Sequence, residues 1–474
     1  MVGAGISGLA AAWRLGRLRH DVEITVLEAA DRVGGKLLVS SLDGVDVDEG
    51  AESMLATRPE AVALAREVGL GADLVHPAVA APSLVVGGDL LALPPGLVMG
   101  VPTDLARLAR SGVLSSAALA RLPLDHVLPQ TPTGEDISLG EFVGRRLGPE
   151  VVDRLVSPLL LGVYADRAVN VSMRAAVPRL FDAVQHERSL LAAARSVRGP
   201  VREDAEPRPV FAGIRGGVGR LPVALAERLR EAGVRIETGA TVRHLRRAER
   251  GWELVVGATV AERVVTADAV VLAVPAPAAH KLVRGLSVQA ETELGEIETT
   301  SVAVVTLLYS VDDLPGGDVP EGSGYLVPPS EGRVVKAATF ASHKWGWLGE
   351  ECAERRVVAV RCSLGHADDV EVLQRDDESL ARVAADDLGF VLRLGRARPV
   401  AWRVSRWGGG LPRYSVGHVD RAARITLALE HLPGLTAVGA AFDGVGIPAC
   451  IARADHAATL ISQRLSSDGE WRHG

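Results

Sequence analysis

The sequence predicts an α/β protein whose nucleotide-binding domain is assembled from three separated segments. Three observations predict this: a glycine-rich turn at residues 3–8, an acidic residue (Glu28) ending the next strand, and the return of an α/β pattern at residues 211–247 and 435–462. The 474 residues suffice for two or three domains, and a hydrophobic content of 47% allows a large core.

The composition excludes several classes of protein. The net charge is −7 without a basic tail or face, so we expect no nucleic-acid partner. The three cysteines are scattered and no His/Cys spacing fits a metal, so we expect no metal and a reducing cytoplasm. We see no signal peptide. Residues 78–102 are apolar but broken by Asp89, Gly and Pro, which indicates buried strands, a pocket wall or a membrane-facing patch.

The first motif is the glycine turn. Gly3, Gly5 and Gly8 give G-x-G-x-x-G: a tight turn, close backbone approach to a pyrophosphate, and close packing of the next helix. The helical stretch LAAAWRL then points its N-terminal amides at the phosphates. The strand VEITVLE ends at Glu28, 20 residues after Gly8, where a carboxylate reaches ribose hydroxyls. Together these features predict a Rossmann-type dinucleotide site.

A first strand is the missing part of this unit. Only Met1 and Val2 precede the turn, whereas a strand of about five residues is expected. Either the natural chain begins upstream, or the chain is shortened and the site weakened. We favour the first, because everything downstream of the turn is intact.

Further elements follow in order. Asp46–Ser53 forms a turn-rich loop after a short strand, and residues 59–70 form a helix. Residues 103–200 are mostly helical, most clearly at 139–160, and the Pro-rich stretch 198–209 is an exposed linker. Strands are expected at these positions: 251–256, 263–277 and 302–311, the last opening a more antiparallel sheet that runs to about residue 400.

A second signature follows Glu28. Arg32, Gly34, Gly35 and Lys36 complete E-x-x-x-R-x-G-G, which resembles the flavoprotein family of monoamine oxidases, phytoene desaturases and protoporphyrinogen oxidases. Within that family the chain is similar to the oxygen-dependent protoporphyrinogen/coproporphyrinogen oxidases of haem synthesis. The stretches that carry this resemblance are GAES, LPPGLVMGVP, SPLLLGVYADRAVNVS, FAGIRGGVGRLP, LPRYSVGH and GAAFDGVGIPACI.

The resemblance implies non-covalent FAD and a division of the chain into domains. FAD binds to segments 1–83, 207–283 and 423–474; residues 84–206 form a helical substrate- and membrane-facing insertion, and 284–422 a substrate domain with a mixed or antiparallel sheet. The implied FAD ligands are Gly3, Ala4, Gly5, Ile6, Ser7, Gly8, Glu28, Ala29, Arg32, Gly34, Gly35, Lys36, Gly50, Ala51, Glu52, Ser53, Val242, Trp407, Val445, Gly446 and Ile447.

Each group of these residues has an implied role. Residues 3–8 hold the pyrophosphate, and Glu28 with Ala29 holds the adenosine ribose, while Val242 meets the adenine. Lys36 and the loop 50–53 line the middle of FAD and the flavin. Trp407 lies near the flavin, and residues 445–447 close over its pyrimidine end, where helix amides stabilise negative charge.

Two departures bear on the substrate. Family members acting on protoporphyrinogen often carry arginine where Glu52 and Val98 stand, and LPPGLVMGVP is instead similar to the Gram-positive branch, the coproporphyrinogen III oxidases. Coproporphyrinogen carries four propionates rather than two, so its carboxylates need further partners. The candidate substrate residues are Arg58, Val98, Lys344, Arg361 and Arg413. The alternative for each charged member is a solvated side chain without substrate contact.

The implied reaction oxidises coproporphyrinogen III to coproporphyrin III by hydride transfer to FAD, and dioxygen reoxidises the flavin with formation of hydrogen peroxide. No nucleophilic arrangement stands out, and no catalytic base is assigned, although His343 and His418 are candidates. Cys450 could carry a covalent flavin, but a packed core cysteine is favoured.

Four alternatives stay open: protoporphyrinogen IX oxidase, flavin amine oxidase, phytoene-type desaturase, and a non-catalytic porphyrin-binding protein. We expect a cytoplasmic enzyme. A peripheral contact at the inner face of the membrane and a transient contact with the next haem-pathway enzyme stay open as well.

Overall fold

The computed structural model describes residues 1–199 and 209–470, so the predicted linker at 198–209 lies largely outside the described residues. One parallel sheet forms the centre of the nucleotide-binding end. Its strands are β1 (Thr25–Leu27), β11 (Arg235–Glu237), β15 (Val270–Leu272) and β21 (Leu435–Ala437). β1 pairs with β11 and β15 with β21, both in parallel, and Val2 forms parallel bridges to β1 and β15. This sheet therefore unites strands from three distant parts of the chain.

The first residues occupy the central place of this sheet. The Val2 N–H donates to the Val271 carbonyl (2.9 Å), and the Gly3 N–H donates to the Leu27 carbonyl (2.7 Å). In the other direction, the Ala273 N–H donates to the Val2 carbonyl (2.8 Å). The short stretch before the glycine turn thus satisfies backbone groups on both neighbouring strands. That upstream residues lengthen it stays a prediction.

Helices cover both faces of the parallel sheet. On one face, helices α1 and α18 pack against each other and against α2 and α11. On the other face lie α12, α13, α17 and the antiparallel sheet β12–β13–β14. The bounds are α1 (Ile6–Leu18), α2 (Pro59–Glu67), α11 (Arg220–Glu231), α12 (Ala276–Val283), α13 (Val288–Gly295), α17 (His418–Glu430), α18 (Ile447–Glu470), β12 (Val242–Arg247), β13 (Trp252–Val256) and β14 (Arg263–Ala267).

A large mixed sheet forms the second unit. Its strand order is β20–β16–β19–β18–β17–β6–β7, in which only β17 and β6 are parallel, and α16 (Asp377–Val391) packs on one face. The strands are β6 (Pro82–Val86), β7 (Asp89–Ala92), β16 (Thr299–Ser310), β17 (Gly324–Leu326), β18 (Val335–Phe340), β19 (Val357–Leu364) and β20 (Pro399–Pro412). The predicted boundary at residue 84 falls within β6, because this hairpin extends the sheet.

Helices fill the region between the sheet hairpin and residue 199, and their buried faces share one apolar core. The helix α5 ends at Gly148, whose φ of 99° suits glycine. The bounds are α3 (Leu105–Arg110), α4 (Ser116–Arg121), α5 (Leu139–Leu147), α6 (Pro149–Val151), α7 (Ser157–Tyr164), α8 (Met173–Ala176), α9 (Pro178–His186) and α10 (Leu190–Arg198).

Small elements connect these units. They are β2 (Val39–Leu42), β3 (Val45–Asp48), β4 (Met54–Leu55), β5 (Leu74–Val75), β8 (Leu97–Val98), β9 (Val101–Pro102), β10 (Phe211–Ile214), α14 (Ala341–Lys344) and α15 (Gly346–Glu354). β2 and β3 form a hairpin that leads into the loop at residues 49–53.

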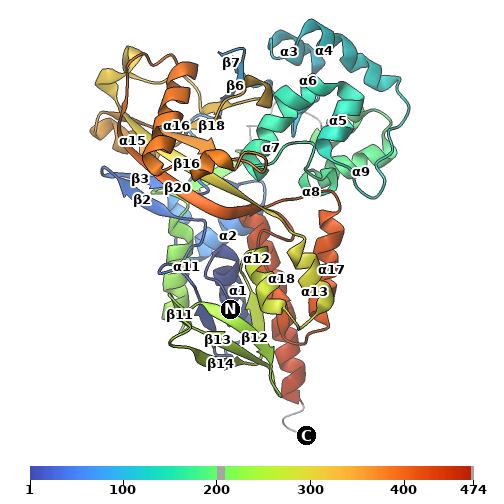
Figure 1. Cartoon of the computed structure of the whole chain (residues 1–474), viewed down its shortest axis with the longest axis vertical. Coiled ribbons are helices and arrows are strands. Elements are labelled where there is room, and N and C mark those ends of the chain that lie inside the picture. Colours follow the sequence, from blue (N-terminus) through green and yellow to red (C-terminus); the bar gives the residue numbers. More distant parts are fainter. Residues whose placement is uncertain (200–208, 471–474) are drawn as a thin grey trace.

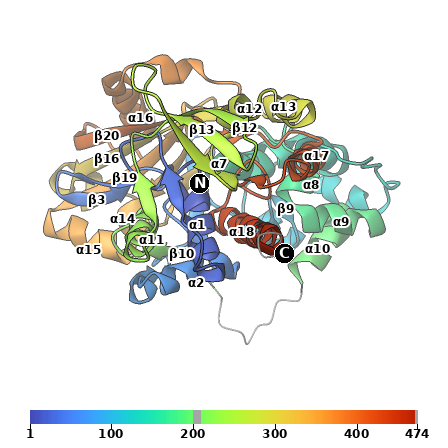
Figure 2. The same cartoon turned by 90° about the horizontal axis from the view of Figure 1, so that it is seen from below.

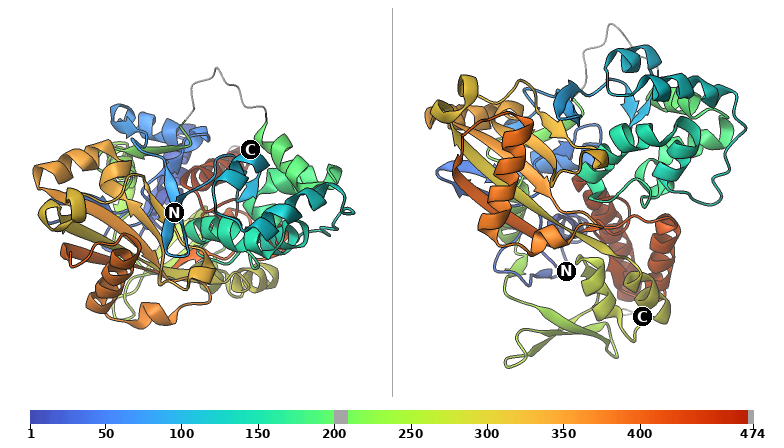
Figure 3. Two further views of the ribbon diagram at one scale, coloured as in Figure 1. Left: turned by 90° about the horizontal axis from the view of Figure 1, so that it is seen from above. Right: turned by 45° about the horizontal axis from the view of Figure 1, so that its top comes forward.

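The units are arranged as three bodies. Figure 1 shows the mixed sheet and the helical region side by side above the nucleotide-binding domain. Figure 2 shows α1 and α18 next to each other, consistent with their packing. In Figure 3 the mixed sheet and the helices flank the end of the nucleotide domain from two sides. The predicted fold class is confirmed: a nucleotide-binding domain from three segments, a helical insertion and a mixed-sheet domain.

Within residues 1–199 and 209–470, no helix is long and apolar enough to cross a membrane. The same described part of the chain contains no group of three or more His, Cys, Asp or Glu side chains that could hold a metal ion.

Candidate functional site

The glycine turn has the shape that a bound pyrophosphate requires. A Cβ added at Gly8 would lie 2.0 Å from the Gly3 carbonyl oxygen, and one at Gly3 would lie 2.5 Å from the Ala273 oxygen. At Gly5, by contrast, an added Cβ meets nothing within 4 Å, and no side chain caps α1 there. The helix N-terminus therefore opens on space that an anionic group can occupy. Ala4, Ile6 and Ser7 complete the turn.

Glu28 lies beside this turn, at the end of β1. Its carboxylate accepts from the Ala4 N–H (2.6 Å) and from the Ala30 N–H (2.8 Å). The Ala240 N–H donates to the Glu28 carbonyl (2.7 Å), which brings the approach to β12 and Val242 to the same edge. Ala29 is exposed at this edge. The residues predicted for ribose and adenine are thus brought together.

The Arg32–Lys36 segment lies against the glycine turn. The Gly34 N–H donates to the Ala4 carbonyl (2.8 Å), and a Cβ at Gly35 would lie 3.3 Å from the Gly5 Cα. Arg32 donates to the Gly35 carbonyl (2.9 Å) and so holds the segment in place. The glycine pair is needed because the two turns touch.

Lys36 is the cation at the end of this segment. The residue is solvent-accessible, yet desolvation by the surrounding protein lowers its pKa. An anionic group placed there would find an amine without a carboxylate partner among the described residues, which fits the pyrophosphate of FAD.

The C-terminal turn closes on the same place. Burial raises the pKa of the Cys450 thiol, while the Ser7 hydroxyl and the Lys36 ammonium oppose that rise, so the three side chains lie close together. Cys450 is 6% exposed. Val445 packs on the core of the helical region, and Ile447 opens α18. The start of α18 and the start of α1 therefore meet at one site, with Gly446 between Val445 and Ile447.

The loop at residues 49–53 lies under β20. The Trp407 indole N–H donates to the Glu49 carbonyl (2.9 Å). A Cβ at Gly50 would lie 1.9 Å from the Lys36 oxygen, so only glycine fits. Ala51 is exposed and Ser53 precedes β4. Trp407, this loop and Lys36 are thus neighbours, as the sequence predicts.

Glu52 is the centre of a buried charge cluster. Lys344 donates to one carboxylate oxygen (2.5 Å), and Arg361 donates to the other and to the Gly50 carbonyl (2.7 Å). Burial would raise the pKa of Glu52, yet the two cations lower it to about 2. The three side chains are 8 to 16% exposed. Two cations thus contact one carboxylate, and the buried carboxylate of Asp48 lies close enough to interact with Arg361 and Glu52.

The other predicted substrate residues have different surroundings. Arg413 donates to Asp166 (2.7 Å) and to Glu298 (2.5 Å), and its Asp166 bond raises its pKa. Arg58 pairs with Glu60 (2.6 Å) at the start of α2. Val98, on β8, is half-buried against the helical core.

Asp48 is a residue that the sequence analysis missed. Its carboxylate accepts from the Val218 and Gly219 N–H groups (both 3.0 Å) and so fixes the loop start to the GIRGGVG stretch. Burial raises its pKa to about 6, against the effect of Arg361. In the sequence, Asp48 stands out only as a further acidic residue of the DVDEGAES stretch that contains Glu52. Its hydrogen-bond partners are evident only from the fold.

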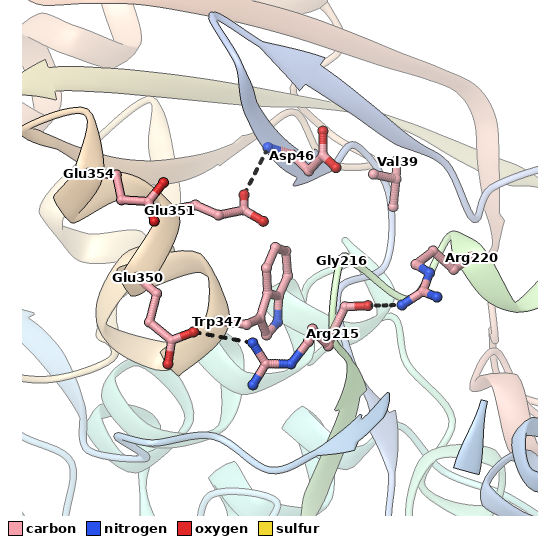
Figure 4. Close-up of a pocket in the computed structure, with 9 residues that line it drawn as sticks. All are labelled: Val39, Asp46, Arg215, Gly216, Arg220, Trp347, Glu350, Glu351 and Glu354. Carbon is pink, nitrogen blue, oxygen red and sulfur yellow. Dashed lines mark hydrogen bonds and ion pairs between the residues drawn. The ribbon is translucent and has the colours of Figure 1, made fainter. Parts of the chain in front are cut away.

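Two cavities lie beside this site rather than in it. Figure 4 shows one of about 420 Å³, in which Arg215 pairs with Glu350 (3.2 Å) and Glu351 accepts from the Asp46 N–H. A second, of about 600 Å³, lies between Arg32 and α11. Neither is lined by the glycine turn or by the Glu52 cluster.

Comparison with known proteins decides the family. Residues 6–462 match the family described as flavin containing amine oxidoreductase. The chain belongs to this family. It is 37% identical to the coproporphyrinogen III oxidase of Mycobacterium tuberculosis, covering 98% of both chains, and 31% identical to that of Bacillus subtilis, covering 98% and 97%. The crystal structure of a putative protoporphyrinogen oxidase from Exiguobacterium matches with a TM-score of 0.84 and 29% identity, covering 98% of each chain.

Membership of this family confirms three predictions from the sequence: the family resemblance, a flavin cofactor, and an oxidoreductase. The likeness to these proteins extends over nearly the whole chain, so it includes the helical region and the mixed sheet as well as the nucleotide domain. The roles of individual site residues stay predictions, supported by the positions described above.

Proposed function

We propose that this flavoprotein binds FAD without a covalent bond and oxidises coproporphyrinogen III to coproporphyrin III with dioxygen. The observation that carries the proposal is the nearly full-length likeness to relatives named coproporphyrinogen III oxidase, at up to 37% identity. When bound, FAD supplies the hydride acceptor, and dioxygen then takes the electrons as hydrogen peroxide. The protein binds FAD and the substrate, orients them towards each other and excludes water.

The cradle fits FAD. The cradle offers the open helix N-terminus at Gly5, the Glu28 carboxylate and the Lys36 amine, which has no carboxylate partner among the described residues. These donors and this acceptor stand in the order that pyrophosphate and ribose need. Cys450 supports non-covalent binding, because its thiol is buried and its pKa is raised by burial.

The substrate face is the side of the mixed sheet that carries Arg361. Thr339 lies directly opposite Arg361 in the sheet, so its side chain shares that face. Leu326, on β17 of the same sheet, packs on the helical core together with Val98 and Val445. We propose that the porphyrinogen ring binds against these apolar side chains, where the sheet meets the helices.

The Glu52 cluster supplies charge beside this face. Lys344 and Arg361 bring two cations to the Glu52 carboxylate, and a substrate propionate would be attracted to these cations. Arg58 is the next candidate, because its pair with Glu60 is partly exposed. Arg413 already contacts two carboxylates, so we assign it a structural part.

The test is to purify the protein, record its absorption spectrum, and follow porphyrin fluorescence in air with coproporphyrinogen III and with protoporphyrinogen IX. We expect a yellow protein that releases FAD on denaturation and has the higher kcat/KM with coproporphyrinogen. A higher value with protoporphyrinogen would establish the second candidate, and a colourless protein active on neither would overturn the proposal.

We further propose a cytoplasmic location, because Cys352, Cys362 and Cys450 are all free thiols. Peripheral contact with the inner face of the membrane, and transient contact with the enzyme that takes the product, are proposals that fractionation and pull-down with that enzyme can test.

A further inference from the structure

Three buried rings lie in a row where the main units of the fold meet, and two of them are stacked. Tyr164, the last residue of α7, lies with its ring centroid 5.5 Å from that of Tyr414, and Tyr414 lies 4.0 Å from His418 at an interplanar angle of 19°. The rings are 7%, 2% and 1% exposed. Tyr164 belongs to the helical region, whereas Tyr414 and His418 join β20 to α17. Stacking of this kind stabilises beyond the area that it buries.

Tyr414 is the middle ring and connects two units by hydrogen bonds. Its hydroxyl donates to the Ala440 carbonyl (2.6 Å), which lies in the turn between β21 and α18. Its own carbonyl accepts from the Ser172 N–H (2.7 Å) at the start of α8. One residue therefore ties the helical region to the C-terminal turn.

His418 supports this arrangement as a neutral ring. Its ring lies beside the backbone of Ala441 and Phe442, but neither ring nitrogen has a hydrogen-bond partner within the part of the chain that the structure describes. Burial, followed by the nearby Arg421, lowers its pKa to about 4, against the opposing charge of Asp136. A neutral, enclosed imidazole packs on Tyr414 and is not placed to exchange protons with a substrate.

We infer that Tyr414 is a positioning residue for the C-terminal turn, and that through Ala440 it sets where Val445, Gly446 and the N-terminus of α18 stand against the flavin. This inference rests on the proposed FAD binding. The first amides of a helix stabilise negative charge, so their placement matters more for reduced than for oxidised FAD. Without the Tyr414 hydroxyl, binding FAD must itself order the turn.

The test compares Tyr414→Phe with Tyr309→Phe in the FAD-loaded enzyme. Both changes remove one buried hydroxyl and keep the ring. The Tyr309 hydroxyl has no hydrogen-bond partner among the described residues and lies in the core under α16, so it is a matched control. We expect Tyr414→Phe to raise the Kd for oxidised FAD about fivefold, and Tyr309→Phe to leave it unchanged.

The midpoint potential gives a readout that simple loss of stability would not move. If reduced FAD loses a further factor of about five in affinity, the potential becomes about 20 mV more negative in Tyr414→Phe. Amide hydrogen exchange should rise at residues 439–446 alone, whereas general destabilisation would raise it throughout the sheet.

The outcomes separate this inference from the function on which it depends. A wild-type protein that binds no FAD overturns the proposed function. A wild-type protein that binds FAD, together with a Tyr414→Phe enzyme of unchanged Kd and potential, overturns the role of Tyr414 alone. Should Tyr414→Phe fail to fold, Tyr164→Leu removes the outer ring and leaves the hydroxyl bond. Smaller shifts in the same direction are then expected, and their absence counts against the inference.

Discussion

The glycine turn and the Glu52 charge cluster reach their geometry by different means. In the turn, Gly3, Gly5 and Gly8 act through their backbone, and an added Cβ at Gly8 would overlap the Gly3 oxygen. In the cluster, the charge of Glu52 depends on Lys344 and Arg361, which are 292 and 309 residues away in the chain. The glycine turn therefore depends on the backbone conformation of a few neighbouring residues, whereas the charge cluster depends on the whole tertiary fold.

The largest expected effect is at the glycine turn. Gly8→Ala puts a Cβ 2.0 Å from a backbone oxygen, so the turn must shift. We expect about 3 kcal/mol lower stability and loss of FAD binding, measured by thermal unfolding and flavin absorbance. Gly389→Ala, in α16, meets nothing within 4 Å and should keep FAD and gain up to about 1 kcal/mol. Retention of FAD by Gly8→Ala would show that the turn is not at the cofactor.

The charge cluster should respond next. Glu52→Gln removes the carboxylate that both Lys344 and Arg361 contact, and we expect a loss of about 3 kcal/mol in the free energy of unfolding. The matched control is Glu378→Gln, whose partner Arg382 is on the surface and whose loss should cost less than about 0.5 kcal/mol. Equal effects of both changes would mean that the cluster is solvated.

Arg413 sharpens the distinction between a structural and a substrate-binding arginine. Arg413→Gln leaves Asp166, whose side chain is 1% exposed, without its charged partner, so we expect a loss of about 2 kcal/mol. KM for coproporphyrinogen should change less than about twofold, because a structural Arg413 makes no contact with the substrate. A tenfold rise in KM at unchanged stability would instead place Arg413 at a propionate.

The smallest effect is a pH dependence at the ring stack. The pKa of His418 falls from its ordinary 6.5 to about 4 in the fold, so between these values the unfolded chain binds a proton that the native state refuses. The stability linked to the neutral His418 is therefore fully present above pH 6.5, and it declines as the pH falls towards 4. Between pH 7.5 and 5.5 the loss should be about 1 kcal/mol.

His418→Phe should remove this part of the pH dependence, measured as urea unfolding at both pH values. His20→Gln, at an exposed position, serves as the control and should retain the dependence of the wild-type protein. If His418→Phe shows the same decline as the wild type, the decline comes from other groups.

Local patterns predicted much of the nucleotide site. The glycine spacing, Glu28 at the end of β1 and the Arg32–Lys36 segment are close in sequence, and the structure brings them into contact. Helix α2 begins at Pro59, as expected from periodicity and the proline. Such features depend on backbone conformation and near neighbours, which short stretches specify.

Long-range contacts were beyond such reasoning. The sequence suggested Lys344 and Arg361 as separate propionate partners, but the strands bring both to Glu52. The sequence analysis placed most of the β6–β7 hairpin in the helical insertion, whereas in the structure this hairpin extends the mixed sheet. Partners across a sheet are set by register and topology, which a single sequence does not display.

The sequence by itself determined the family, the position of the glycine turn and the order of the segments, because glycine spacing and strand or helix periodicity are local properties of the chain. Only the tertiary structure decided which charges neutralise each other, that Val2 completes the parallel sheet, and that Tyr414 bonds to Ala440. The physical reason is that these contacts arise when distant segments are packed against one another, and their free energy depends on burial that exists only in the assembled fold.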